Sequence, residues 1–174
     1  MSSKINTNLS VNNNISSLLG NGSEMNISFE NTLLSIQNLY NYIQLANEEK
    51  LDKNTVEFVN KLKLSINWYE HSMVNDNLSF TLISLFIGLE TLIFFGDFKE
   101  NNKKSIISNS CSILLGTTVK EKYEIRDKLI KLYNERNKVM HDGHHITINL
   151  YQDITWLKDI LQRTIRKNFS LLKK

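Results

Sequence analysis

Apolar residues recur at three- and four-residue intervals along most of the chain, the spacing that places them on one face of an α-helix. This pattern predicts helices over residues 29–43, 54–75, 78–95, 105–115, 118–143 and 149–169. No segment shows sustained alternation of apolar and polar residues, and no turn dipeptide joins two strand-like runs. The sequence therefore predicts an all-α bundle of about five to six helices.

Residues that favour helix ends indicate where some of these helices begin and stop. Asn54, with Glu57 three residues later, is a predicted N-cap, and Thr118 with Glu121 has the spacing of a capping box. Gly143 stands where the latter helix is expected to end, because glycine readily adopts the left-handed conformation that closes a helix.

The apolar stripes also predict which side chains are buried. On the helix over 118–143 the expected apolar face holds Val119, Tyr123, Leu129, Tyr133 and Met140. Trp68 and Tyr69, on the helix over 54–75, are expected in the core or in a dimer interface rather than as platforms for RNA bases.

The apolar segment 78–95 reaches the minimum length of a membrane-spanning helix. It carries Glu90 and several Ser, Thr and Gly residues, and a carboxylate near mid-membrane costs roughly 2.5–3.5 kcal/mol. We therefore expect segment 78–95 to be the buried central helix of a bundle, and we expect no association with a membrane. Residues 1–26 lack the apolar core of a secretory signal, which favours a cytoplasmic location.

Length and composition indicate a single globular domain. The chain has 174 residues, of which 41% are hydrophobic and 22% charged, and it contains no proline to interrupt long helices. Its one cysteine, Cys111, excludes an internal disulfide framework and a cysteine-rich zinc module. Residues 1–27 are weakly periodic and rich in Ser and Asn, so we expect a loosely ordered lead-in before a helical domain over 28–174.

The net charge of +3 is unevenly distributed along the chain. Residues 118–174 hold 13 Lys and Arg against 7 Asp and Glu, whereas the rest of the chain holds 8 against 11. This basic third favours an anionic partner such as RNA, although a solvated helix face explains the same charges. Lys138, Arg163, Arg166 and Lys167 are candidate contacts to an RNA backbone on the first interpretation.

The end of the helix over 118–143 carries an arginine, an amide and a histidine. Asn137 and His141 are four residues apart and therefore share a helix face. Arg136 and His141 are five apart, about 140° around an ideal helix. Their head groups converge only if the helix ends or frays near His141, or if the arginine side chain wraps around. The stop expected at Gly143 makes that convergence feasible.

Such a trio suits cleavage of RNA by its own ribose 2′-hydroxyl, a reaction that needs no metal or other cofactor. His141 can act as base or acid near neutral pH, and a guanidinium can grip the phosphate oxygens of the transition state. Asn137 can orient His141 or the phosphate. One motif supplies one histidine, so two subunits would make a more complete site. Spacing alone favours a simpler interpretation, in which these residues only cap the helix end, because cations are favoured at helix C-termini.

The stretch LYNERNKVMHDG, residues 132–143, resembles the signature of the HEPN superfamily, particularly its Apea-like branch. Arg136, Asn137 and His141 match the family's Arg, polar residue and His, with four residues between Arg and His. Upstream, the chain is similar to the family's Trp-Tyr segment followed by an apolar helix bearing a glutamate, here Glu90. The resemblance covers roughly residues 55–165.

This resemblance implies a HEPN-like bundle that forms a homodimer, in which two motifs line one cleft. For active members it implies a metal-independent endoribonuclease that leaves 2′,3′-cyclic phosphate and 5′-hydroxyl ends. Such members act as toxins or anti-phage effectors, and an antitoxin or regulatory protein is then a partner. Some relatives are inactive, so a non-catalytic dimerising module that binds RNA or protein is the alternative. A structural helical protein with an accidental motif is the third interpretation.

Two further groups of residues bear on this site. Glu90 lies in the most apolar helix, where an unpaired carboxylate would cost several kcal/mol. We expect it to pair with Arg136 and position the guanidinium, or to form a structural pair with Arg126 or a tyrosine hydroxyl. His144 and His145 follow a glycine, and no set of Asp, Glu or Cys completes a metal-ligand spacing with them. We expect them to be solvent-exposed loop residues, and they are candidate contacts to an RNA substrate rather than metal ligands.

Overall fold

A computed structural model describes residue 44 and residues 51–94, 102–143, 146 and 150–171, and the account below is confined to them. This part of the chain holds the helices α3 (Lys53–Val74), α4 (Leu78–Ile93), α5 (Lys103–Leu115), α6 (Val119–Asp142) and α7 (Tyr151–Leu171). These residues include no strand, so the predicted all-α class is confirmed. The lead-in over 1–27 and the helix predicted over 29–43 lie outside the described residues.

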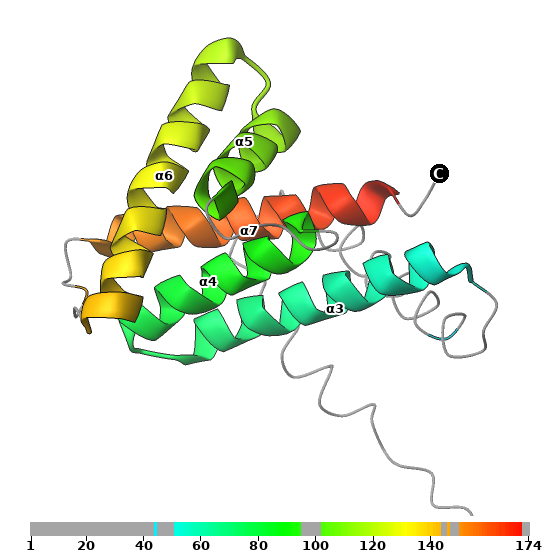
Figure 1. The fold of residues 1–174 in the computed structure, drawn as a ribbon, viewed down its shortest axis with the longest axis horizontal. Helices are drawn as coiled ribbons and strands as arrows, with labels where there is room; N and C mark the ends of the chain where they lie inside the picture. Colours follow the sequence, from blue (N-terminus) through cyan, green and yellow to red (C-terminus); the bar gives the residue numbers. More distant parts are fainter. Residues whose placement is uncertain (1–43, 45–50, 95–101, 144–145, 147–149, 172–174) are drawn as a thin grey trace, which may run out of the picture.

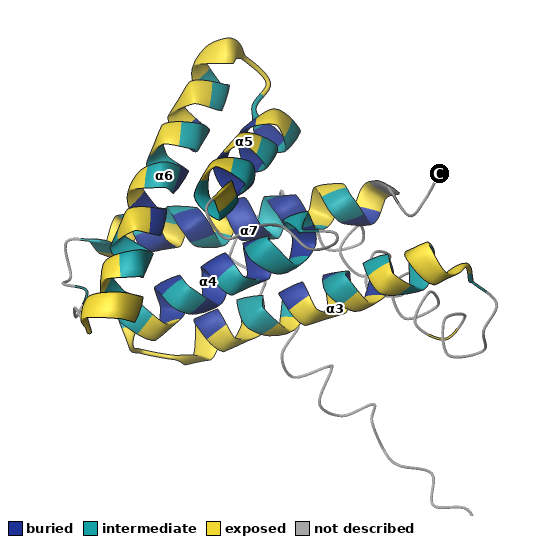
Figure 2. Cartoon of the chain, viewed as in Figure 1, coloured by how far each residue is buried: buried dark blue, intermediate teal, exposed yellow. Residues whose placement is uncertain are grey.

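Helix α4 is the centre of the bundle, as its largely apolar sequence predicts. It contacts each of the other helices described, and Leu82, Leu85, Phe86 and Leu89 are completely buried along it. Figure 2 shows this buried surface between α3 and α7. Within the described ranges, no helix combines the length and the apolar character needed to cross a membrane.

Helices α3, α4 and α7 pack together, and α5 and α6 form a hairpin that packs on this group and projects from it (Figure 1). The three helices of the first group approach closely at Gly88. Ser65 Oγ of α3 donates a hydrogen bond to the Gly88 carbonyl at 2.9 Å. A Cβ added at Gly88 would lie 2.8 Å from Cδ2 of Leu161 in α7. The glycine therefore allows α4 to sit between its two neighbours.

The N-cap of α3 lies two residues earlier than the sequence predicts. Asp52, not Asn54, is the N-cap, and its Oδ1 accepts hydrogen bonds from the backbone N–H groups of Asn54 and Thr55. Glu57 does not return to the helix start, because its carboxylate pairs with Lys61 one turn later, with Oε1 and Nζ 3.0 Å apart. The Asn54 prediction is therefore wrong.

Both predicted ends of α6 are confirmed. Thr118 is the N-cap and accepts a hydrogen bond from the Glu121 N–H at 3.2 Å, while the Glu121 carboxylate accepts one from the Thr117 N–H at 2.8 Å. At the other end Gly143 adopts φ +62°, and its N–H donates to the Lys138 carbonyl.

The middle of α6 is buried while its ends extend beyond the core. Leu129 and Tyr133 are buried as predicted, whereas Val119 is 71% and Met140 51% exposed. Tyr123 is also exposed, so three residues of the predicted apolar face lie outside the core. A helix of 24 residues is about 36 Å long, more than the bundle beneath it can cover.

The carboxylate of Asp153 ties the start of α7 to the middle of α6. Lys128 Nζ lies 2.9 Å from one of its oxygens, and Lys131 Nζ lies 3.4 Å from the other. The hydrogen bond from Lys128 is the main cause that lowers the pKa of Asp153 below its ordinary value.

Asp153→Asn is expected to weaken the fold at neutral pH and to reduce its sensitivity to acid. Because the folded-state pKa is depressed, the carboxylate stabilises the fold above its unfolded pKa of about 3.9, and this contribution is lost as pH falls through the folded-state pKa. Urea unfolding at pH 7 should show that the variant loses up to about 1 kcal/mol in the free energy of unfolding. As the pH is lowered, the free energy of unfolding should fall less steeply in the variant than in wild type. Asp159→Asn, on an exposed part of α7, is the control. Equal acid sensitivity of Asp153→Asn and wild type would contradict the assignment.

Candidate active site

Helices α4 and α6 bring a carboxylate and a guanidinium together near the end of the bundle where α6 stops. Arg136 Nη2 lies 3.5 Å from Glu90 Oε1, and each of these side chains is 17% exposed. Arg136 Nη1 also donates a hydrogen bond to Asn137 Oδ1 at 3.2 Å. The predicted pairing of Glu90 with Arg136 is thus present, whereas Arg126 pairs with its neighbour Asp127.

Tyr133 contacts both members of this ion pair, although the sequence placed it simply in the core. Its hydroxyl donates a hydrogen bond to Glu90 Oε1 at 3.3 Å, and Arg136 Cζ lies 5.3 Å from the centroid of its ring. The ring packs edge-on against Phe86 of α4, with centroids 5.2 Å apart and an interplanar angle of 81°. The three-residue spacing from Tyr133 to Arg136 is the signal that sequence reasoning missed.

The guanidinium of Arg136 is held without using all its hydrogen-bond donors. It has five N–H groups; Nη1 donates one to Asn137 Oδ1, and Nη2 forms an ion pair with Glu90. The Nε of Arg136 is buried with no hydrogen-bond partner among the described residues. Such a donor costs about 1–3 kcal/mol and is characteristic of sites under functional constraint. The arrangement is suited to holding an anion through the terminal nitrogens.

His141 lies one turn further along α6 and is exposed to solvent. The helix continues through Asp142, so it does not fray at His141, and the two side chains leave the helix about 140° apart and about 7.5 Å apart along its axis. No hydrogen bond or ion pair joins Arg136 to His141 within the described chain. One copy of the chain therefore holds the guanidinium and the imidazole on different faces of α6.

Among the other predicted RNA contacts, Lys138 lies within the motif on α6. Lys138 is exposed and pairs with Glu135, with Nζ and Oε1 2.8 Å apart. His144 and His145 lie outside the described residues.

Arg163 lies at the opposite end of α6 from the motif. Its Nη2 donates to the Leu115 carbonyl at 3.3 Å and lies 3.7 Å from the Glu121 carboxylate. Glu121 and His141 are 20 residues apart on α6, which is about 30 Å along the helix. Arg166 and Lys167 are exposed and follow Arg163 on α7, leading further from the motif. These three cations do not share a surface with His141.

Metal clusters and cysteine thiols are two other kinds of reactive group. In the part of the chain that the structure describes, no group of three or more His, Cys, Asp or Glu side chains could hold a metal ion. Burial raises the pKa of the Cys111 thiol to about 12, which keeps this side chain protonated and unreactive.

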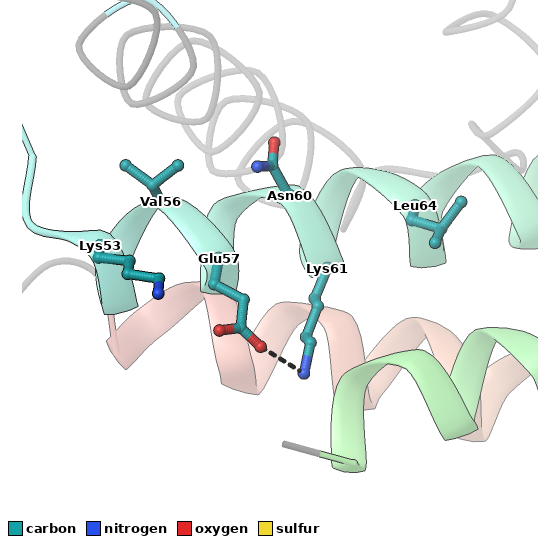
Figure 3. A pocket seen from close by; sticks show the side chains of 6 residues that line it. All are labelled: Lys53, Val56, Glu57, Asn60, Lys61 and Leu64. Atoms are coloured by element: carbon teal, nitrogen blue, oxygen red, sulfur yellow. Dashed lines mark ion pairs between the residues drawn. The ribbon is translucent and has the colours of Figure 1, made fainter. Parts of the chain in front are cut away.

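The pocket in Figure 3 lies on one helix, away from the motif. It is lined by Lys53, Val56, Glu57, Asn60, Lys61 and Leu64. All six belong to α3, and the ion pair of Glu57 with Lys61 satisfies two of its three charged groups. No second helix among the described elements brings a reactive side chain to it.

Comparisons of the chain with models of protein families, with curated proteins and with solved structures found no match. The evidence for function therefore comes from the residues of α4 and α6 themselves. It consists of the ion pair of Glu90 with Arg136, the contacts of Tyr133 and the exposed imidazole of His141.

A double-mutant cycle should show that Glu90 and Arg136 stabilise one another. Glu90→Gln leaves a partly buried guanidinium without its counter-charge, so we expect a loss of about 2–3 kcal/mol in the free energy of unfolding. With Arg136→Met added, the coupling energy from urea unfolding should be about 1–2 kcal/mol. Glu135→Gln, which removes the more exposed pair with Lys138, should cost less than about 1 kcal/mol. Additive losses at Glu90 and Arg136 would rule out the pairing.

Gly143→Ala should destabilise the end of α6 through backbone strain alone. A Cβ at Gly143 would meet no atom within 4 Å, but the positive φ is unfavourable for alanine. We expect a loss of about 1 kcal/mol in the free energy of unfolding and faster hydrogen exchange at the last turn of α6. Asparagine tolerates this left-handed conformation better than alanine, so Gly143→Asn should lose less free energy of unfolding than Gly143→Ala. An unchanged stability in Gly143→Ala would show that the cap contributes nothing.

Proposed function

We propose that this protein is a metal-independent endoribonuclease of the HEPN type that uses Arg136, Asn137 and His141, with Glu90 in support. The observation that carries the proposal is the partly buried guanidinium of Arg136, which Glu90 and Asn137 fix while donors remain for an anion. The exposed imidazole of His141 on the same helix supplies a side chain that can accept and donate a proton. The resemblance of residues 132–143 to the HEPN signature joins these parts into one reaction.

In this reaction a histidine removes the proton of a ribose 2′-hydroxyl, and the 2′-oxygen attacks the adjacent phosphorus. The bond from phosphorus to the 5′-oxygen breaks, and a second proton donor protonates that oxygen. The products are a 2′,3′-cyclic phosphate and a 5′-hydroxyl. Arg136 stabilises the charge that develops on the non-bridging oxygens, and Asn137 orients the phosphate or the guanidinium.

The division of the motif between two faces of α6 supports a site shared by two copies. In a homodimer, two motifs would line one cleft around a single phosphate, so that the His141 imidazole of one copy acts as base and that of the other as acid. Exposed apolar side chains near this end of the bundle are suited to such an interface. They are Met73, Val74, Phe80, Met140 and Tyr151. A hydrogen bond from Ile146 N–H to Ser79 Oγ, 3.1 Å long, ties the segment after α6 to α4 here.

The biological setting follows from the resemblance and belongs to the proposal. A HEPN ribonuclease of this size would act on cytoplasmic RNA as a toxin or as an anti-phage effector. Because unrestrained cleavage of cellular RNA is harmful, an antitoxin or regulatory protein would be its partner.

A non-catalytic module that dimerises and binds RNA or protein is the second candidate. Two observations favour it: Glu90 already neutralises Arg136, and one chain does not bring His141 to the guanidinium. In such a module the ion pair would hold α4 against α6, and His141 would be a surface residue.

Purified protein should cleave RNA in the presence of a metal chelator, and His141→Ala and Arg136→Ala should each lower the rate by roughly 100-fold or more. A labelled RNA and analysis of its termini measure both the rate and the predicted cyclic phosphate. His71→Ala removes an exposed histidine outside the motif and should cleave like wild type.

The same variants separate the two candidate functions. Expression of wild type, but not of His141→Ala, should arrest bacterial growth and fragment cellular RNA. Binding of RNA without cleavage by any folded variant would instead favour the non-catalytic module. Cleavage that persists unchanged in His141→Ala would exclude His141 from the reaction.

A further inference from the structure

Tyr133 is the residue of the α4–α6 contact that neither the motif nor the resemblance assigns to the site. It is buried, and its ring packs on Phe86, which is completely buried in the central helix. Because the ring is fixed by the core, the hydroxyl at its end has a defined position. That hydroxyl reaches the Glu90 carboxylate.

Two donors meet on one oxygen of Glu90. The Tyr133 hydroxyl lies 3.3 Å from Glu90 Oε1, and Arg136 Nη2 lies 3.5 Å from the same atom. If its only contact were one long ion pair with the guanidinium, the Glu90 carboxylate could rotate, and this rotation would displace the guanidinium. The bond from Tyr133 limits the rotation of the carboxylate, while Asn137 holds the guanidinium from its other side.

The ring of Tyr133 also supports the guanidinium directly. Arg136 Cζ lies 5.3 Å from the ring centroid, within the range of a cation–π contact. The Nε of Arg136 is buried, so an incoming anion meets the terminal nitrogens. Arginine has many rotamers, and a site that fixes one of them in advance avoids the entropy loss on binding.

We propose that Tyr133 is a positioning residue that preorganises Arg136 for a phosphodiester oxygen, through its hydroxyl on Glu90 and its ring beside the guanidinium. This inference deepens the proposed ribonuclease function and rests on it only for the catalytic measurement. The chain offers a matched control in Tyr123, which lies on the same helix with Arg126 Cζ 4.6 Å from its ring centroid but is exposed and outside the motif.

Three variants separate the two contacts of Tyr133. Tyr133→Phe keeps the ring and removes the hydroxyl, Tyr133→Leu removes both, and Tyr123→Phe is the control. The Nε–Hε signal of Arg136 in a ¹⁵N-edited NMR spectrum, assigned with Arg136→Lys, reports the position of the guanidinium. Titration with inorganic phosphate, followed on this signal, reports the affinity of the site for a tetrahedral anion.

Tyr133→Phe should shift the Arg136 signal and weaken phosphate binding about three- to tenfold, because it removes one hydrogen bond to a charged group. Tyr133→Leu should weaken binding further, and Tyr123→Phe should change neither measurement. In RNA cleavage, Tyr133→Phe should lower kcat about tenfold with a smaller change in KM, because many contacts along the RNA set KM.

The inference is overturned if folded Tyr133→Phe keeps the Arg136 signal and phosphate affinity of wild type, or if wild type does not bind phosphate. If Tyr133→Phe does not fold, Glu90→Gln replaces it, and an unchanged Arg136 signal in that variant has the same meaning. A protein that cleaves no RNA in any form refutes the proposed function, whereas the NMR and phosphate measurements still decide the role of Tyr133.

Discussion

The ion pair between Glu90 and Arg136 is the interaction on which the site depends. Glu90 belongs to α4, the helix with the most apolar surroundings, where an unpaired carboxylate would be costly. Arg136 supplies the counter-charge from α6, and Tyr133 completes the contact with its hydroxyl and ring. The same three side chains hold α6 against α4 and keep a cation near the surface. Removing the charge of either partner would therefore disturb the packing and the candidate chemistry together.

Much of the fold is predictable because it follows from local patterns. The largely apolar sequence of α4 requires a central position in the bundle. The caps of α6 act locally, Thr118 through its hydroxyl on the Glu121 N–H and Gly143 through its own backbone. The start of α3 was not predictable in the same way, because Glu57 has two possible partners and binds Lys61. The exposure of Met140 was missed for another reason. Periodicity indicates which face of a helix is apolar, but it does not tell how far the neighbouring helices extend beneath that face.

The candidate site was predictable only where burial forces a pairing. A carboxylate in an apolar helix needs a partner, so the contact of Glu90 with Arg136 followed from the sequence as one of two alternatives. The structure contains both alternatives at once, since the Tyr133 hydroxyl reaches the same oxygen. Charge composition was a poorer guide. The basic C-terminal third includes Arg163, which contacts the start of α6 rather than the motif, because net charge along a sequence carries no information on distance in the fold.

The separation of Arg136 and His141 along α6 limits what chemistry one copy of the chain can perform. Side chains five residues apart on an intact helix point in different directions, and the intact last turn of α6 keeps Arg136 and His141 apart in this way. Cleavage by a 2′-hydroxyl needs a base and an acid on opposite sides of the phosphorus, and one histidine does not fill both positions at the same time. In the proposed homodimer this requirement is met only when the His141 side chains of both copies face the same phosphate, one as base and the other as acid. The intact last turn of α6 therefore leaves a single copy incomplete as a ribonuclease, and this is the condition that a catalytic dimer has to meet.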